Sequence, residues 1–240
     1  MIKIFPNTAE LSQAAAQVFT QTARQAVQEN GRFAVALTGG SSPRQLYQLL
    51  AQAPYREQVP WEQTLVFWGD ERWVPLSDER SNARMAFQTL LDQVPVPQDQ
   101  IFPMWGEGSP DQFAHVYEKT LRKQLGPAAR FDLVLLGMGD DGHTASLFPR
   151  TAVLQERERL VQAYFLEAQN MHRITLTAPC LNQARKIVFM TFGEKKAPAL
   201  YEVLEGERNS AQYPAQLIQP ERGEVLWLVD EAAANKLSST

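Results

Sequence analysis

The sequence has little cysteine, no long apolar run and no excess of basic charge. Its single cysteine, Cys180, excludes an intrachain disulfide and a zinc site built from several thiolates. No apolar run approaches the roughly 20 residues of a membrane-spanning helix, and the apolar stretch at the N-terminus is too short for a secretory signal. We therefore expect a cytoplasmic protein with no membrane partner and with Cys180 as a small buried side chain.

The charge balance gives no indication of nucleic acid as a partner. The 240 residues include 23 Lys and Arg against 27 Asp and Glu, a net charge of −4, whereas contacts with a phosphate backbone need a basic excess. An acidic protein can still bind a small anion where helix N-termini, Arg or Lys provide a local positive field. The positions of individual cations are therefore informative.

Short apolar runs alternate with segments of helical periodicity along the chain. Asn7 and Gly31 bound a long first helix as its expected cap and stop. The expected strands cover residues 32–37, 64–68, 131–136, 174–177, 186–190 and 225–229, and the further expected helices cover 43–53, 81–92, 111–125 and 194–205. This alternation predicts an α/β fold, a single domain over residues 1–240 with a doubly wound, mostly parallel sheet and helices on both faces.

Polar loops follow several of the expected strands, and in open sheets of this kind ligands bind outside the carboxyl ends of the strands. The first such loop contains Gly39-Gly40-Ser41-Ser42-Pro43 and opens a helix. Free backbone N–H groups and hydroxyls in this position suit a phosphate. The Gly-Lys-Ser/Thr ending of a nucleotide-binding P-loop is missing, and an ordinary turn with a serine cap is the alternative.

A second loop, Gly137-Met138-Gly139-Asp140-Asp141-Gly142, matches the dinucleotide pattern G-x-G-x-x-G. This would suggest a nicotinamide or flavin dehydrogenase. Two adjacent carboxylates would repel a pyrophosphate, and no clear ribose-binding acid ends a strand about 20 residues further on. The loop therefore favours a different chemistry.

That chemistry is indicated by His143, two residues after Asp141 in the same loop. Imidazole exchanges protons near neutral pH, and a neighbouring carboxylate can orient it, so the pair suits general-base catalysis. The other two histidines, His115 on an expected amphipathic helix and His172 at a strand start, are interpreted as solvated or structural.

Cations follow two more expected strands. Arg72 belongs to Gly69-Asp70-Glu71-Arg72-Trp73, which is either a surface salt-bridge cluster or a guanidinium clamp for phosphate. Lys195 and Lys196 open a helix after the strand over residues 186–190, where a solvated pair is the simpler interpretation. Neither signal decides a function alone.

Together these stretches resemble the 6-phosphogluconolactonases over roughly residues 30 to 205. The matching motifs are Gly39-Gly40-Ser41-Ser42-Pro43, Asp70-Glu71-Arg72, Val74-Pro75, Ser81-Asn82, Gly137 through Pro149, Arg173-Ile174-Thr175-Leu176-Thr177 and Lys196-Ala197. The resemblance implies a Rossmann-like fold and hydrolysis of 6-phospho-D-glucono-1,5-lactone, a small phosphorylated sugar lactone. It implies that His143 activates water with support from Asp141, and that no metal or organic cofactor is needed. The positions it implies for substrate and phosphate are Gly40, Ser41, Ser42, Asp70, Arg72, Arg173 and Lys196. We expect a monomer or a small homo-oligomer.

Two alternatives remain open. Glucosamine-6-phosphate deaminases share the glycine turn and the Asp-Gly-His stretch, but they have an acid five residues after the histidine, where this chain has Phe148. Their Asp-Glu is followed by Tyr, where this chain has Arg72. A non-catalytic sugar-phosphate sensor would keep the phosphate cradle, but it would leave the Asp141 and His143 pair unexplained.

Overall fold

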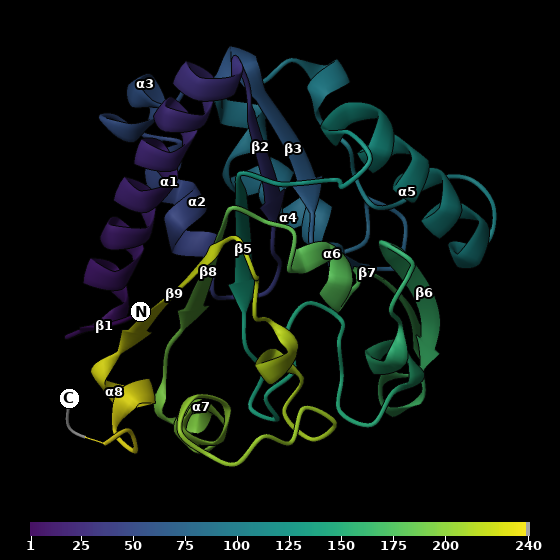
Figure 1. The fold of residues 1–240 in the computed structure, drawn as a ribbon. Coiled ribbons are helices and arrows are strands. Elements are labelled where there is room, and N and C mark those ends of the chain that lie inside the picture. The colour runs from purple at the N-terminus through teal and green to yellow at the C-terminus, as the bar shows by residue number, and fades with distance from the viewer. Residues whose placement is uncertain (239–240) are drawn as a thin grey trace.

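The computed structural model describes residues 1–238 and contains two β-sheets, of which the larger is parallel throughout (Figure 1). Its order is β1 (Ile2–Phe5), β9 (Glu224–Asp230), β8 (Lys186–Thr191), β5 (Leu133–Gly137), β2 (Phe33–Leu37) and β3 (Thr64–Trp68). Strands β2 and β3 are buried along their whole length, which is why they occur in the sequence as unbroken apolar runs. The parallel α/β architecture predicted from the sequence is confirmed.

Helices flank this sheet, with α1 to α3 on the left of Figure 1 and α5 on the right. The first, α1 (Thr8–Asn30), has the expected ends: Asn7 accepts the N–H of Glu10, and Gly31 ends the helix at φ 73°. The other α-helices are α2 (Arg44–Leu50), α3 (Tyr55–Gln58), α4 (Asn82–Thr89), α5 (Pro110–Leu125), α6 (Ala178–Leu181), α7 (Ala197–Leu204) and α8 (Glu231–Ala234). The 3₁₀ segments are η1 (Trp61–Gln63), η2 (Leu91–Gln93), η3 (Gln98–Gln100), η4 (Ala152–Gln155), η5 (Glu167–Gln169), η6 (Glu194–Lys196) and η7 (Pro214–Leu217).

A second sheet, which the sequence pattern did not predict, is antiparallel and has the order β4 (Asp70–Arg72), β7 (Met171–Leu176), β6 (Val161–Leu166). The expected strand over 174–177 lies here and not in the main sheet. The pattern missed β4 because it has three charged residues and no apolar run. It missed β6 because Val-Gln-Ala-Tyr-Phe-Leu is neither an unbroken apolar run nor a strict apolar–polar alternation.

The main sheet changes winding direction between β2 and β5. From β2 the chain moves outward to β3, whereas from β5 it moves the opposite way through β8 to β9. The glycine-serine turn follows β2, and the Gly137–His143 loop follows β5. Both loops therefore lie at the topological switch point, where ligands bind in doubly wound sheets.

Candidate active site

A cavity of about 240 Å³ lies at this switch point. Eight of the nine site residues predicted from the sequence line it: Gly40, Ser41, Ser42, Asp70, Arg72, His143, Arg173 and Lys196. The ninth, Asp141, does not line the cavity but contacts the imidazole that does. The fold thus brings together residues from five separate stretches of the chain.

The imidazole of His143 is oriented by Asp141. Its Nδ1 lies 2.6 Å from Asp141 Oδ1, and the same carboxylate oxygen accepts the backbone N–H of His143 at 3.1 Å. Since an ionised carboxylate only accepts hydrogen bonds, Nδ1 carries a proton, and in the neutral imidazole Nε2 has the lone pair. Partial burial acts to raise the pKa of Asp141, but hydrogen bonding and charge from His143 outweigh it and lower the pKa. The hydrogen bond thus fixes the tautomer of the imidazole and leaves Nε2 as the nitrogen that could take up a proton.

Glycine at position 139 is required by the packing of this pair. A Cβ built on Gly139 would collide with the His143 ring and the Asp141 carboxylate. The next glycine, Gly142, has φ 77° and packs against Tyr213. The glycine pattern that matches a dinucleotide loop therefore makes room for a catalytically suitable Asp and His.

Two arginines face each other on the small sheet. Arg72 of β4 is directly opposite Arg173 of β7 in the antiparallel register, so both side chains are on the same face. Burial lowers the pKa of Arg173, and the charge of Asp70 acts in the opposite direction. Like charges opposite each other destabilise a sheet. An anion bound between the two guanidinium groups would offset that cost.

Asp70 organises the groups around these arginines. Its carboxylate accepts the Ser146 hydroxyl at 2.6 Å and the Asn82 amide at 3.3 Å, and it lies 3.9 Å from Arg173. Because its oxygens are engaged in this way, Asp70 positions neighbouring side chains of the cavity, Arg173 among them. Lys196 is also paired, with Asp140 at 2.6 Å.

The glycine-serine turn also lines the cavity. Gly40 has φ 83°, a left-handed conformation that favours glycine. Within residues 1–238, no backbone carbonyl accepts the N–H groups of Gly40, Ser41 or Ser42. These backbone donors are therefore available to an anion, as an anion cradle requires.

Residues that the sequence reasoning did not assign to the site also line the cavity, among them Asn82, Phe148 and Gln169. Asn82 and Phe148 lie within the motifs, so their spacing could have indicated them. Gln169, in η5, accepts a hydrogen bond from Arg173. It follows a strand that the pattern did not reveal, and no local signal marks it.

Glu71 is fully buried behind the site and acts as an acceptor for the start of α4. Its two oxygens accept the N–H groups of Arg72, Asn82 and Ala83 and the hydroxyl of Ser81, at 2.7 to 3.0 Å. Burial raises the pKa of Glu71 to about 7, and these four donors oppose the rise by favouring the carboxylate. The side chain links the Arg72 backbone to the helix that carries Asn82.

We expect Glu71→Ala to lower the free energy of unfolding by about 3–5 kcal/mol, because it leaves several buried donors without an acceptor. Urea denaturation monitored by fluorescence measures this change. Glu79→Ala, at an exposed position eight residues away, is the matched control and should change the free energy by less than about 0.5 kcal/mol. Equal effects of the two substitutions would contradict the bridging role.

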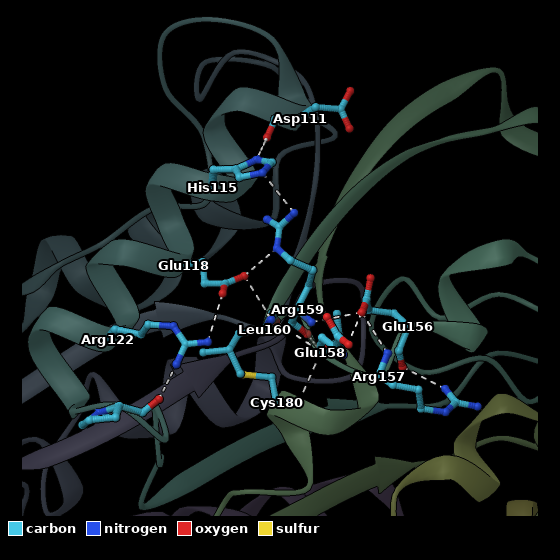
Figure 2. Close-up of polar contacts among 12 residues, drawn as sticks. Asp111, His115, Glu118, Arg122, Glu156, Arg157, Glu158, Arg159, Leu160 and Cys180 are labelled. Atoms are coloured by element: carbon cyan, nitrogen blue, oxygen red, sulfur yellow. Dashed lines mark hydrogen bonds and ion pairs between the residues drawn. The ribbon is translucent and has the colours of Figure 1, made fainter.

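The other two histidines lie outside the cavity, as the sequence indicated. Figure 2 shows His115 on α5, where its Nδ1 contacts the Asp111 carbonyl at 2.8 Å and its Nε2 contacts Arg159 at 3.1 Å. Glu118 binds Arg159 and Arg122 in the same network. His172 packs edge-on against Phe165. Cys180 is buried, as expected, and burial raises the pKa of its thiol to about 12.

Two further features hold for the part of the chain that the structure describes. No group of three or more His, Cys, Asp or Glu side chains is arranged to hold a metal ion. None of the helices is both long enough and apolar enough to cross a membrane.

The protein is thus of the doubly wound α/β class, with His143 and two opposed arginines on one cavity at the switch point. Residues 6–227 match the family described as glucosamine-6-phosphate isomerases/6-phosphogluconolactonase, and the chain belongs to this family. It is 44% identical over 217 residues to the 6-phosphogluconolactonase of Synechocystis, covering 88% of each chain. It is 37% identical to the human 6-phosphogluconolactonase, covering 99% of this chain and 94% of that protein. The solved 6-phosphogluconolactonase of Trypanosoma cruzi superposes with a TM-score of 0.87 at 28% identity, covering 99% of this chain and 97% of that one.

Proposed function

We propose that the protein hydrolyses 6-phospho-D-glucono-1,5-lactone to 6-phosphogluconate, the second step of the oxidative pentose phosphate pathway. The observation that carries this proposal is the position of His143, held by Asp141, on the same cavity as Arg72 and Arg173. A base and an anion site on one cavity suit a substrate with a hydrolysable group and a phosphate at opposite ends. The curated relatives named above support the same activity.

In the proposed mechanism, Nε2 of His143 takes a proton from a water molecule as the water oxygen bonds to the lactone carbonyl carbon. The carbonyl π electrons move to oxygen and form a tetrahedral intermediate. When the carbonyl re-forms, the bond to the ring oxygen breaks, and the imidazolium returns its proton to that oxygen as the hydroxyl of the open acid. Asp141 stabilises the imidazolium between the two transfers.

The phosphate of the substrate is proposed to bind between the arginines and the glycine-serine turn. Arg72 and Arg173 offer guanidinium donors, and the turn at Gly40, Ser41 and Ser42 offers backbone N–H groups and hydroxyls. Lys196 is held by Asp140 at the edge of the same cavity and adds positive charge. Asp70 acts indirectly, by holding Arg173.

The phosphate is expected to contribute strongly to catalysis. With freshly prepared lactones in a pH-stat, kcat/KM for 6-phosphogluconolactone should exceed that for unphosphorylated glucono-1,5-lactone by at least about 10²-fold, the effect of two charge-assisted contacts. Arg173→Gln should reduce this preference while leaving the rate on the unphosphorylated lactone nearly unchanged. Equal kcat/KM values for the two lactones in the wild type would contradict the phosphate site.

The same preparation tests the deaminase alternative. The enzyme should release no ammonia from glucosamine 6-phosphate, because Phe148 stands where the deaminases have an acid. Ammonia release at a rate comparable to lactone hydrolysis would reverse the assignment.

A further inference from the structure

The ring of Phe148 is stacked on the imidazole of His143. The two ring centroids are 4.0 Å apart, the interplanar angle is 20°, and Phe148 is 8% exposed. We propose that Phe148 is a positioning residue that fixes the plane of the His143 ring and stabilises its protonated form during the reaction. This inference rests on the proposed function, because it concerns the same base.

His143 needs a second restraint because the contact with Asp141 fixes only one edge of its ring. A single hydrogen bond to Nδ1 leaves the imidazole free to tilt about that contact, and the side chain is 27% exposed. The surrounding loop has φ 77° at Gly142 and φ 47° at Ala145 and is not part of a helix or strand. A flat aromatic face against the ring removes the tilt and keeps Nε2 directed at the cavity.

Phe148 is itself well held. Its carbonyl accepts the Thr151 hydroxyl at 2.7 Å, and the preceding Leu147 is fully buried. Pro149 follows it and restricts the backbone of position 148 to extended conformations. The aromatic face is therefore a rigid support for the more exposed imidazole.

The stacking also stabilises the positive charge that His143 acquires when it is protonated in the proposed reaction. When Nε2 takes a proton from water, an imidazolium lies against the negative face of the phenyl ring, a favourable cation–π arrangement. A phenyl ring has no hydrogen-bonding group, so it cannot compete with water for Nε2 or with His143 for Asp141. An aliphatic side chain of similar volume would fill the space without this electrostatic support.

Phe148 also contacts the guanidinium of Arg173, whose Cζ lies 5.5 Å from the ring centroid. Arg173 has two further polar partners, Asp70 and Gln169, whereas Asp141 is the one side chain recorded as hydrogen-bonded to the His143 ring within residues 1–238. Loss of the aromatic ring should therefore disturb the base more than the phosphate ligand. We expect the effect of substitution on kcat to exceed its effect on KM.

The test compares Phe148→Leu, Phe148→Tyr and a control, Phe102→Leu, which removes an aromatic ring stacked on Phe67 at 4.7 Å, away from the site. Phe148→Leu should lower kcat for 6-phosphogluconolactone about 3- to 30-fold, the range of a partly desolvated cation–π contact. It should also move the acidic limb of the kcat/KM profile about 0.4 to 1.5 pH units lower, since the imidazolium loses support. Phe148→Tyr keeps the aromatic face and should restore both values.

A readout independent of activity is the proton NMR spectrum, which contains imidazole signals from only three histidines. The His143 signal is assigned by its loss in His143→Ala. At a pH where the three imidazoles are neutral, it should move downfield in Phe148→Leu, because the shielding of the stacked ring is lost, while the His115 and His172 signals stay in place. Phe102→Leu should lower the melting temperature without changing the His143 signal or the pH profile.

The outcomes separate this inference from the proposed function. Wild-type kcat and an unmoved His143 signal in Phe148→Leu would overturn the inference while leaving lactone hydrolysis intact. A fall in kcat that Phe148→Tyr does not restore, with a melting temperature lowered as in Phe102→Leu, would also overturn it by indicating a structural role. A wild type without lactonase activity would refute the proposed function, and the NMR comparison would still decide whether the rings are stacked.

Discussion

Gly139→Ala is expected to lower kcat for lactone hydrolysis by about 10²-fold or more, close to the loss of the base itself. The added methyl group would occupy the space of the His143 ring and the Asp141 carboxylate, so the pair must separate or turn away. Gly139 does not have a positive φ, so alanine fits its backbone. Because both displaced side chains are partly exposed and can move toward solvent, the melting temperature should change little.

Gly31→Ala is the matched control for this substitution. Gly31 ends α1 with φ 73°, and no atom lies within 4 Å of an added Cβ. Alanine there should lower stability by about 1 kcal/mol through backbone strain and leave kcat unchanged. Circular dichroism melting and the pH-stat assay together measure both effects. If Gly139→Ala retained wild-type kcat, the packing of the catalytic pair against this glycine would be refuted.

The sequence predicted the Asp–His pair because both residues lie in one short loop after a buried strand. Asp141 and His143 are two positions apart, so no tertiary information is needed to place them together. The glycine-serine turn is equally local, and the alternating pattern predicts that both loops lie at the carboxyl ends of strands, whereas the strand order that makes this a switch point comes from the fold. Local spacing is therefore sufficient to predict the Asp–His pair and the glycine-serine turn.

The opposed arginines could not be derived in this way. Arg72 and Arg173 are about 100 residues apart and meet only because β4 and β7 pair antiparallel. The three charged residues of β4 show no strand periodicity, so the sequence pattern did not predict the second sheet. The family resemblance indicated both residues, but their register against each other comes from the fold.

The sequence also could not predict which charged side chains pair with each other. Asp70 and Lys196 were expected at the substrate, and both line the cavity, yet each is engaged by another side chain. Which carboxylate compensates which cation depends on side-chain directions that spacing does not determine. The role of Glu71 as a buried hydrogen-bond acceptor was not predicted for the same reason. An acid between Asp70 and Arg72 is typical of a solvated charge cluster.

The role of His143 is best tested by its removal. General-base catalysis contributes about 10² to 10⁴ in rate, or roughly 3 to 5 kcal/mol in activation free energy. His143→Ala should lose that factor in kcat while KM changes little, since the phosphate ligands remain in place. His172→Ala removes an exposed imidazole outside the cavity and should retain wild-type kcat.

The decisive measurement is the initial rate of proton release from saturating, freshly prepared 6-phosphogluconolactone in a pH-stat near neutral pH, corrected for spontaneous hydrolysis. Wild type and His172→Ala should give equal kcat, and His143→Ala a value at least about 10²-fold lower. A His143→Ala enzyme that turns over at the wild-type rate would contradict water activation by this imidazole.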